Sequence, residues 1–189
     1  MKNALLIHGT CDKEEYFDDK YPSLSNSHWF PWLQKQLLIH DIFTQTPEMP
    51  EVYKPDYLKW KKEFEQFEVN SETILIGHSG GGGFLLRWLS EIKPVINKLV
   101  LVAPWLDPLK QETTDFFDFD IDKNIQDRLK EMHILTSDDE KVDGVIESAT
   151  SLREIFNKAC VHTFHHLGHF TFEEMKTEKF PELLKIILS

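Results

Sequence analysis

One serine of this sequence lies in a glycine-rich turn where its hydroxyl could act as a nucleophile. Residues 73–83 read Thr-Ile-Leu-Ile-Gly-His-Ser-Gly-Gly-Gly-Gly, a β-branched apolar run followed by G-x-S-x-G around Ser79. A helical pattern of apolar residues continues from Phe84. The order strand, turn, helix is the context in which this motif forms a nucleophile elbow. The spacing therefore predicts that Ser79 attacks an electrophilic carbon of a substrate.

The glycines around this serine have a mechanical role. A serine on so sharp a turn takes a strained backbone conformation, and neighbouring backbone comes too close for a Cβ atom at the flanking positions. Gly77 and Gly81 provide that clearance. The helix that follows would point the amide of Gly80 toward negative charge on a substrate oxygen. A phosphate-binding turn is the alternative, but no lysine follows the glycines as a P-loop requires.

A serine hydroxyl needs a base to take its proton and a third group to orient that base. An acid and then a histidine should follow the serine, each after a later strand. Asp138 and Asp139 follow a predicted strand at 132–136, and His169 follows the last predicted strand in a Gly-His-Phe turn. We favour Asp139 because it precedes Val142 by three residues, the spacing that commonly places the orienting acid at the strand end. A helix N-cap or a solvated loop charge is the alternative for either carboxylate.

The oxyanion of an acyl-transfer reaction needs two hydrogen-bond donors. Besides the Gly80 amide, we expect a backbone N–H from Thr10 or Cys11, because the strand before them should neighbour the elbow strand at the switch point of the sheet. His8 and His78 are expected to be hydrogen-bonded framework groups beneath the site. The candidates for contact with a substrate are His8, Cys11, Trp29 and Trp105.

Several histidines near the end of the chain also raise the possibility of a metal site. His162, His165 and His166 accompany His169, and imidazoles are common zinc ligands. No His-rich partner segment occurs elsewhere, and these residues straddle a strand end instead of one helix face. We therefore expect no metal and no cofactor, and a metal-dependent hydrolase is the minor alternative.

These side chains must be positioned by a fold in which strands and helices alternate. Continuous apolar runs predict strands at 4–7, 42–46, 73–76, 99–103, 132–136 and 160–164. Helical spacing predicts helices near 29–38, 57–67, 84–89, 121–130, 142–156 and 183–188. This alternation predicts a parallel sheet covered on both faces, a three-layer α/β fold. Residues 104–123 interrupt it, either as a small lid near the site or as an acidic segment that anchors its phenylalanines in the core.

Length and charge exclude several other classes of protein. The 189 residues fit one domain, 1–189, and the net charge of −11 argues against nucleic acid or an anionic membrane as the main partner. The two cysteines, Cys11 and Cys160, lie far apart and in no metal-ligand spacing, which indicates a reducing compartment. The apolar run after Lys2 is too short for the core of a signal peptide. We therefore expect a cytoplasmic protein that acts on a small molecule.

Five segments resemble the small α/β-hydrolases related to YdeN and to retinoblastoma-binding protein nine, and they span nearly the whole chain. They are Leu6-Ile7-His8-Gly9, His28-Trp29-Phe30-Pro31-Trp32-Leu33, Ile76-Gly77-His78-Ser79, Ser137-Asp138-Asp139 and Leu167-Gly168-His169-Phe170. The His-Trp-Phe-Pro-Trp-Leu run is the most specific of these to the family.

The resemblance implies an α/β-hydrolase core without the usual first hairpin and without a large cap, with strand order 2-1-3-4-5-6. It implies a catalytic triad of Ser79, Asp139 and His169 and the activity of a serine hydrolase on small esters. The sequence departs from the family pattern at two places. The glycine run from Gly80 is unusually long, and Glu140 replaces the proline that often follows the acid.

Two classes of function fit these observations. The first is hydrolysis of a small carboxylic ester through an acyl-enzyme, and a thioester or amide would use the same groups. The second is a protein-interaction module on a catalytically weak or inactive hydrolase scaffold, since fold alone does not fix function. It is motivated by Trp29, Trp32 and Trp105, which the sequence suggests are exposed, and by the phenylalanine-rich acidic segment.

Overall fold

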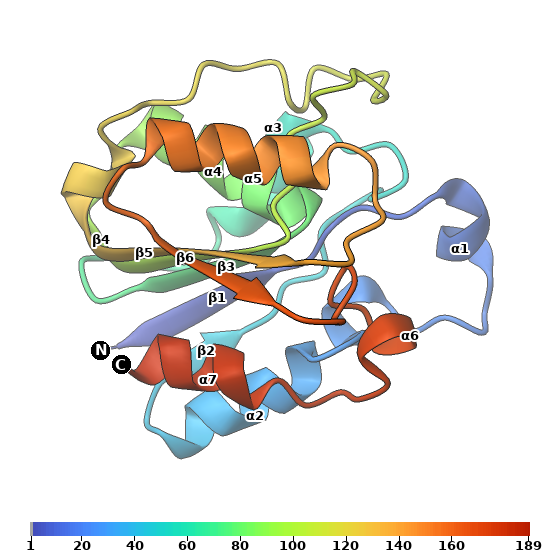
Figure 1. Ribbon diagram of the computed structural model, residues 1–189, viewed down its shortest axis with the longest axis horizontal. Coiled ribbons are helices and arrows are strands. Elements are labelled where there is room, and N and C mark those ends of the chain that lie inside the picture. The colour runs from blue at the N-terminus through green and yellow to red at the C-terminus, as the bar shows by residue number, and fades with distance from the viewer. Residues whose placement is uncertain (1) are drawn as a thin grey trace.

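A six-stranded parallel sheet forms the centre of the molecule (Figure 1). The computed structural model describes residues 2–189. The strands pair in the order β2-β1-β3-β4-β5-β6, and every pairing is parallel, which confirms the predicted sheet and strand order. The strands are β1 (Asn3–Ile7), β2 (Phe43–Gln45), β3 (Ile74–His78), β4 (Ile96–Val102), β5 (Leu129–Ser137) and β6 (Cys160–Phe164).

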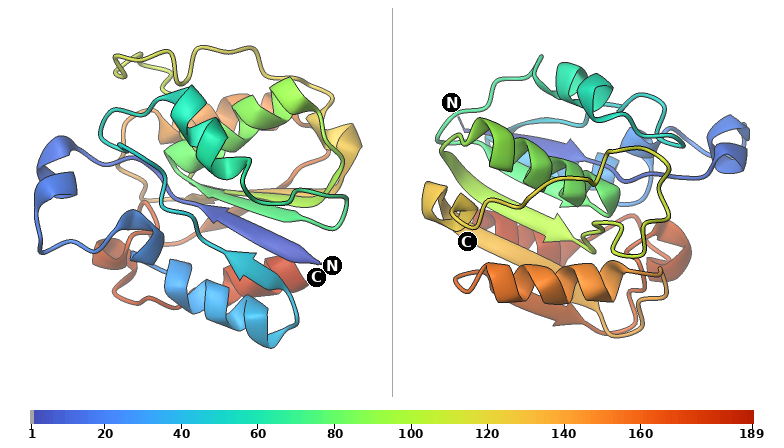
Figure 2. Two further views of the ribbon diagram at one scale, coloured as in Figure 1. Left: turned by 180° about the vertical axis from the view of Figure 1, so that it is seen from behind. Right: turned by 90° about the horizontal axis from the view of Figure 1, so that it is seen from above.

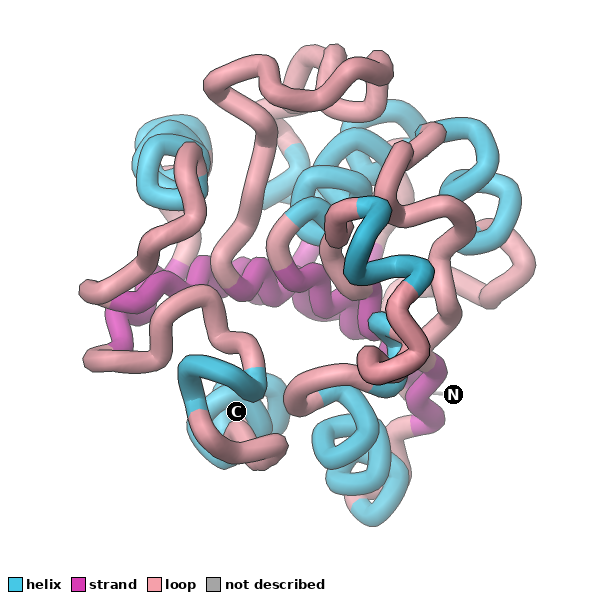
Figure 3. Tube along the Cα trace, turned by 90° about the vertical axis from the view of Figure 1, so that its right-hand side faces the viewer, coloured by secondary structure: helices cyan, strands magenta, loops and turns pink. Residues whose placement is uncertain are grey.

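Helices cover both faces of this sheet. One face carries α2 (Phe30–Ile39) and α7 (Pro181–Leu188). The other carries α3 (Tyr57–Phe64), α4 (Gly80–Ile92) and α5 (Val145–Ile155), which Figure 2 shows from above. In Figure 3 the strands are seen end-on between the two helix layers. The predicted three-layer fold without a large cap domain is confirmed for residues 2–189.

Short helices lie beyond the carboxyl ends of the strands, at the right of Figure 1. They are α1 (Lys13–Phe17) and α6 (Phe172–Met175). Two 3-10 turns, η1 (Leu24–Asn26) and η2 (Ile125–Arg128), complete the elements. Ligands of open parallel sheets bind outside the carboxyl ends of the strands, so α1 and α6 lie on the side where a site is expected.

Alternate residues of each strand enter two separate cores, because successive strand side chains point to opposite faces. On β3, Leu75 packs in the core under α3 and α4 with Phe84, whereas Ile76 packs in the core over α2 and α7 with Leu33 and Leu183. All five side chains are fully buried. Each such side chain contributes about 1.5–3 kcal/mol of hydrophobic free energy on burial, which is why the continuous apolar runs become central strands.

One strand residue breaks the apolar pattern and has a structural explanation. Lys98 on β4 is 3 % exposed, and its Nζ lies 2.8 Å from the carbonyl of Ile186 and 3.2 Å from that of Ile187, at the last turn of α7. The same ammonium pairs with Glu131 at 2.8 Å. Carbonyls at a helix C-terminus lack intrahelical donors, so the lysine satisfies them and fastens α7 to the sheet.

The predicted helix at 121–130 is wrong. Only residues 125–128 form a 3-10 turn, and β5 already begins at Leu129, which pairs with Ile96 of β4. Arg128 bridges to Asp122 at 2.9 Å and donates to the carbonyl of Leu89. Pairing with β4 therefore overrides the local helical pattern.

Residues 104–123 cross over the helices of one face without regular secondary structure, as the yellow-green loop at the top of Figure 1. Phe116 is fully buried, and its ring lies 4.8 Å from that of Trp60. Phe117 packs edge-on against Trp105. Arg87 of α4 donates to the carbonyl of Phe116 at 2.9 Å. This segment is therefore anchored in the core by its phenylalanines, as the second of the two predicted alternatives states.

Candidate active site

Ser79 lies between β3 and α4 in a strained turn. Its φ of 51° and ψ of −125° are outside the regions that residues with a Cβ normally occupy. The turn is held because the Ser79 amide donates to the carbonyl of Val102 at 3.0 Å. The carbonyl of Ser79 accepts from the amides of Gly82 and Trp105 at 3.0 and 3.1 Å. This is the geometry of a nucleophile elbow, with the serine at the carboxyl end of a central strand.

The small residues around the elbow are required by close backbone contacts. A Cβ on Gly81 would lie 2.3 Å from the carbonyl oxygen of His8, and one on Gly77 would lie 2.7 Å from the Cα of Gly82. A Cβ on Gly9 would lie 2.9 Å from that of Ser79. The loop after β1 thus packs directly against the serine, so only glycine fits at these positions.

His169 follows β6, and three hydrogen bonds fix it. Its Nδ1 lies 2.8 Å from the Oε2 atom of Glu140. Its carbonyl accepts from Nε2 of His78 at 2.8 Å, and its amide donates to the carboxylate of Glu174. Because a carboxylate can only accept, Nδ1 carries the proton and Nε2 is left with its lone pair. His169 and Ser79 line one pocket of about 690 Å³.

The prediction that Asp139 orients this histidine is wrong in the structure, because Glu140 makes the contact. The side chain of Glu140 is 1 % exposed. Its Oε1 atom accepts from the amides of Lys141 and Val142 at 2.9 and 2.8 Å, so both carboxylate oxygens have donors. A buried carboxylate with this many donors is a suitable partner for an imidazolium cation.

Asp139 instead supports the loop that carries His169. Its Oδ1 atom accepts from Ser137 Oγ at 2.6 Å and from the Gly168 amide at 2.9 Å. Ser137 Oγ in turn accepts from the Leu167 amide at 3.0 Å. These hydrogen bonds, led by the one from Ser137, lower the pKa of Asp139. Asp139 thus holds the loop beside the site, and Glu140 makes the contact with the imidazole.

The spacing before Val142 misled the sequence prediction, because it identifies the loop but not which of the three consecutive carboxylates, Asp138, Asp139 and Glu140, turns inward. The available signal was Glu140 itself, an acid at a position where the family often has proline. The sequence reasoning also missed Glu174, which holds the His169 amide.

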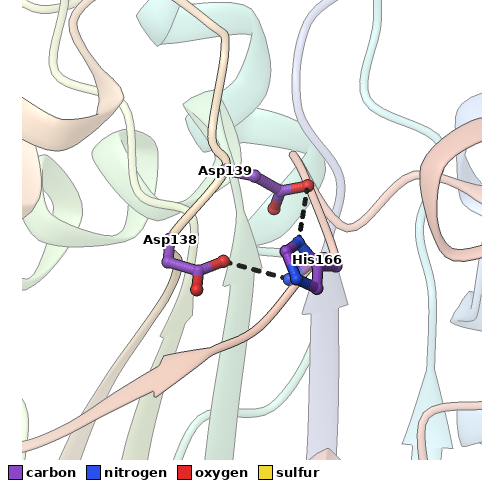
Figure 4. A group of neighbouring side chains, drawn as sticks. All are labelled: Asp138, Asp139 and His166. Carbon is purple, nitrogen blue, oxygen red and sulfur yellow. Dashed lines mark hydrogen bonds and ion pairs between the residues drawn. The ribbon is translucent and has the colours of Figure 1, made fainter.

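Asp138 clamps the same loop from the solvent side. Its Oδ2 atom lies 2.6 Å from Nδ1 of His165, and its Oδ1 atom accepts from the amide of His166 at 3.0 Å. The hydrogen bond from His165 is the main cause of the lowered pKa of Asp138. Figure 4 shows Asp138 and Asp139 beside His166, with one potential ligand atom from each within 4.8 Å of the others. Since both carboxylates already bind the loop, we interpret this exposed group as a clamp.

His8 and His78 are neutral framework groups beneath the site. His8 accepts the Met49 amide on Nε2 at 2.9 Å and donates from Nδ1 to the carbonyl of Gly9 at 2.8 Å, which fixes one tautomer. Burial lowers the pKa of His8. Burial also holds the pKa of His78 well below its usual value. Because both ring nitrogens of His8 and Nε2 of His78 are engaged in hydrogen bonds, His169 is the candidate base.

Two backbone amides adjoin the serine on the side of β1. A Cβ built on Gly80 would lie 3.3 Å from Cγ2 of Thr10, so the two residues are neighbours, and Thr10 lines the pocket. Within residues 2–189 neither the Thr10 amide nor the Gly80 amide has a hydrogen-bond acceptor. Cys11 follows, and burial raises the pKa of its thiol to about 12. It is therefore protonated at neutral pH and unsuited to act as a nucleophile.

The two tryptophans predicted to contact a substrate do not line the pocket. Trp29 is fully buried and stacked on Phe30, with ring centroids 4.3 Å apart. Trp105 is 9 % exposed, and its Nε1 donates to the carbonyl of Asp143 at 3.0 Å. These predictions were wrong because the two hydrophobic cores extend to the carboxyl ends of the strands. Trp32, the third tryptophan that motivated an interaction module, is partly buried against the same core, so two of the three tryptophans offer no exposed ring.

A parallel sheet of order 2-1-3-4-5-6 with a strained serine after its third strand defines an α/β-hydrolase core. A family model described as serine hydrolase matches residues 21–187, and the chain belongs to this family. No helix among residues 2–189 is long and apolar enough to cross a membrane.

Known proteins similar to this chain support the same placement. YdeN of Bacillus subtilis (strain 168) is 26 % identical over 172 residues, which cover 86 % of this chain and 88 % of that protein. The crystal structure of the B. subtilis ydeN gene product matches with a TM-score of 0.83 at 22 % identity, over 100 % of this chain and 97 % of that one. Est1E from Butyrivibrio proteoclasticus matches with a TM-score of 0.66 at 12 % identity, over 100 % and 88 %. The chain is therefore a YdeN-like serine hydrolase.

Proposed function

We propose that this hydrolase cleaves small carboxylic esters or thioesters through a triad of Ser79, His169 and Glu140. The observation that carries the proposal is the buried carboxylate of Glu140, 2.8 Å from Nδ1 of a histidine that lines one pocket with Ser79. Glu140 replaces Asp139 in the triad implied by sequence. Its contact fixes the imidazole tautomer that a general base requires.

In the first half-reaction the Ser79 oxygen attacks the carbonyl carbon while Nε2 of His169 takes the hydroxyl proton. The Thr10 and Gly80 amides donate to the oxyanion that forms, and Glu140 stabilises the imidazolium. When the carbon–oxygen or carbon–sulfur bond to the leaving group breaks, His169 gives its proton to that group. An acyl group remains on Ser79.

In the second half-reaction water replaces the leaving group. His169 takes a proton from the water as the water oxygen attacks the acyl carbon. The proton then returns to Ser79, and a carboxylic acid leaves. Since His8 and His78 are neutral and hydrogen-bonded, they keep the floor of the pocket uncharged while this proton moves.

A fluorophosphonate probe tests the proposal, because phosphonylation requires an activated serine. We expect labelling of the native protein at Ser79, mapped by peptide mass spectrometry, and loss of labelling in Ser79→Ala and His169→Ala. Ser71→Ala, at an exposed position distant in sequence from the elbow, is the matched control and should label normally. Labelling that survives His169→Ala, or a folded native protein that does not react, would contradict the proposal.

A further inference from the structure

The mouth of the pocket is acidic. Glu15 on α1, and Glu173 and Glu178 on or after α6, line the pocket that contains Ser79 and His169, and we call these three glutamates the acidic rim. Among the residues that the structure describes, no lysine or arginine lines this pocket. A fourth glutamate of the lining, Glu174, is engaged by the His169 amide.

Within residues 2–189, no ion pair with a lysine or arginine neutralises the charge of the rim. Glu173 lies 4.0 Å from Nδ1 of His28, but that nitrogen accepts the Phe172 amide at 3.1 Å and so carries no proton for an ion pair. Burial lowers the pKa of His28. Burial, Asp12 and Glu173 together raise the pKa of Glu15, which indicates that the carboxylates of α1 and α6 act on one another across the mouth.

Aromatic rings accompany the acidic rim. Tyr21 and Phe172 also line the pocket and are 51 % and 45 % exposed. Glu15 and Tyr21 further line an adjoining pocket of about 340 Å³, together with Tyr16 and Glu48. Carboxylates beside aromatic faces suit an alkylammonium group, which gains both ionic and cation–π attraction.

From this geometry we infer that the pocket selects esters whose distal end carries an ammonium group, over isosteric neutral esters and over esters that carry a carboxylate. The inference rests on the proposed function and names its substrate class. Exposed ion pairs each change an equilibrium by about fivefold at most. With two or three carboxylates we expect a preference of about tenfold in kcat/KM for the cationic ester.

The test compares three thioesters at low ionic strength: acetylthiocholine, its neutral isostere 3,3-dimethylbutyl thioacetate, and a thioacetate whose thiol part ends in a carboxylate. We expect kcat/KM to fall in that order. The preference should shrink from about 0.02 M to about 0.5 M sodium chloride, as the screening length falls from about 20 Å to about 4 Å. The double variant Glu15→Gln, Glu173→Gln should reduce the cationic-to-neutral ratio to about twofold or less.

Glu14→Gln is the matched control, because Glu14 is exposed on the same helix α1 and does not line the pocket. It should retain the wild-type ratio. Equal kcat/KM values for the cationic and neutral thioesters, or a ratio unchanged in the double variant, would overturn the inference.

Calorimetric binding of the same thioesters to Ser79→Ala separates this inference from the proposed function. Tighter binding of acetylthiocholine that the double variant abolishes would support the charge preference even if no thioester were turned over. Equal binding of the cationic and neutral compounds would overturn it. If the protein hydrolysed none of the three thioesters and the fluorophosphonate did not label Ser79, the proposed function would instead be overturned.

Discussion

Replacement of Glu140 by glutamine tests most directly whether Glu140, and not Asp139, orients His169. Glutamine has nearly the same volume, so the 1 % exposed site should still accept it, and its carbonyl oxygen can keep the amides of Lys141 and Val142. Its NH₂ group then faces Nδ1 of His169, where only an acceptor fits. The imidazole must therefore move its proton to Nε2, which faces away from Glu140 and is needed as the base.

The expected loss follows from this change of tautomer. An amide in place of the triad acid leaves the geometry intact but removes the base and the stabilisation of the imidazolium, at a cost of about 10³- to 10⁴-fold in kcat. This corresponds to about 4–5.5 kcal/mol in the barrier. We would measure kcat and KM on p-nitrophenyl acetate and follow thermal unfolding by circular dichroism. KM and the melting temperature should change little.

Asp139→Asn is the matched comparison, because it makes the same chemical change one residue earlier. An asparagine oxygen can still accept from Ser137 Oγ and the Gly168 amide, so we expect a loss of about tenfold or less. Equal losses of activity in Asp139→Asn and Glu140→Gln, with both proteins folded, would show that Glu140 has no special role. Activity of Glu140→Gln within about tenfold of the wild type would show the same.

Three further predictions concern stability. Gly81→Ala forces a Cβ to 2.3 Å from the His8 carbonyl oxygen. We expect urea unfolding to show a loss of about 3 kcal/mol or more in the free energy of unfolding. A loss below about 1 kcal/mol would show that the backbone accommodates the added methyl group. Lys98→Met leaves the C-terminal carbonyls of α7 without their donor. We expect the free energy of unfolding to fall by about 1–3 kcal/mol while kcat is unchanged. An unaltered urea midpoint would show that Lys98 does not stabilise the attachment of α7. Lowering the pH from about 6.5 to about 5 should reduce the free energy of unfolding. Burial lowers the pKa of His78 in the folded protein, so over this range the unfolded chain binds a proton at His78 that the folded chain does not. A free energy of unfolding that is constant over this window would refute the pH prediction. His8, His28, His133 and His162 contribute to the slope with the same sign.

The helix predicted at 121–130 shows where local sequence patterns fail. Its apolar residues fit a helical period, yet β4 offers an unpaired strand edge, and the backbone from Leu129 joins the sheet. The predictions that Trp29 and Trp105 contact a substrate fail for a related reason. Their types suggested a binding surface, but exposure depends on which segments pack over a residue, and both indoles are buried in the same hydrophobic core.

Elements whose formation depends on local residue types could be predicted from the sequence. The elbow around Ser79 follows from glycines that tolerate close backbone contact, and the strands follow from apolar runs that must be buried. The order of serine, acidic loop and histidine along the chain also follows from sequence, because parallel strands bring their carboxyl ends to one edge. These inferences could be made from the residue types and their order alone, although the contact that requires Gly81 comes from the distant carbonyl of His8.

The carboxylate that contacts His169 could be identified only from long-range contacts in the folded protein. Asp138 and Asp139 bind amides of residues 166 and 168, and these long-range hydrogen bonds set the path of both loops. That path directs Glu140 inward, where its side chain reaches Nδ1. The acidic rim likewise exists only because α1 and α6, distant in sequence, meet at one pocket mouth. The carboxylate that contacts His169 is therefore one residue later than the spacing predicts, and side-chain geometry identifies it.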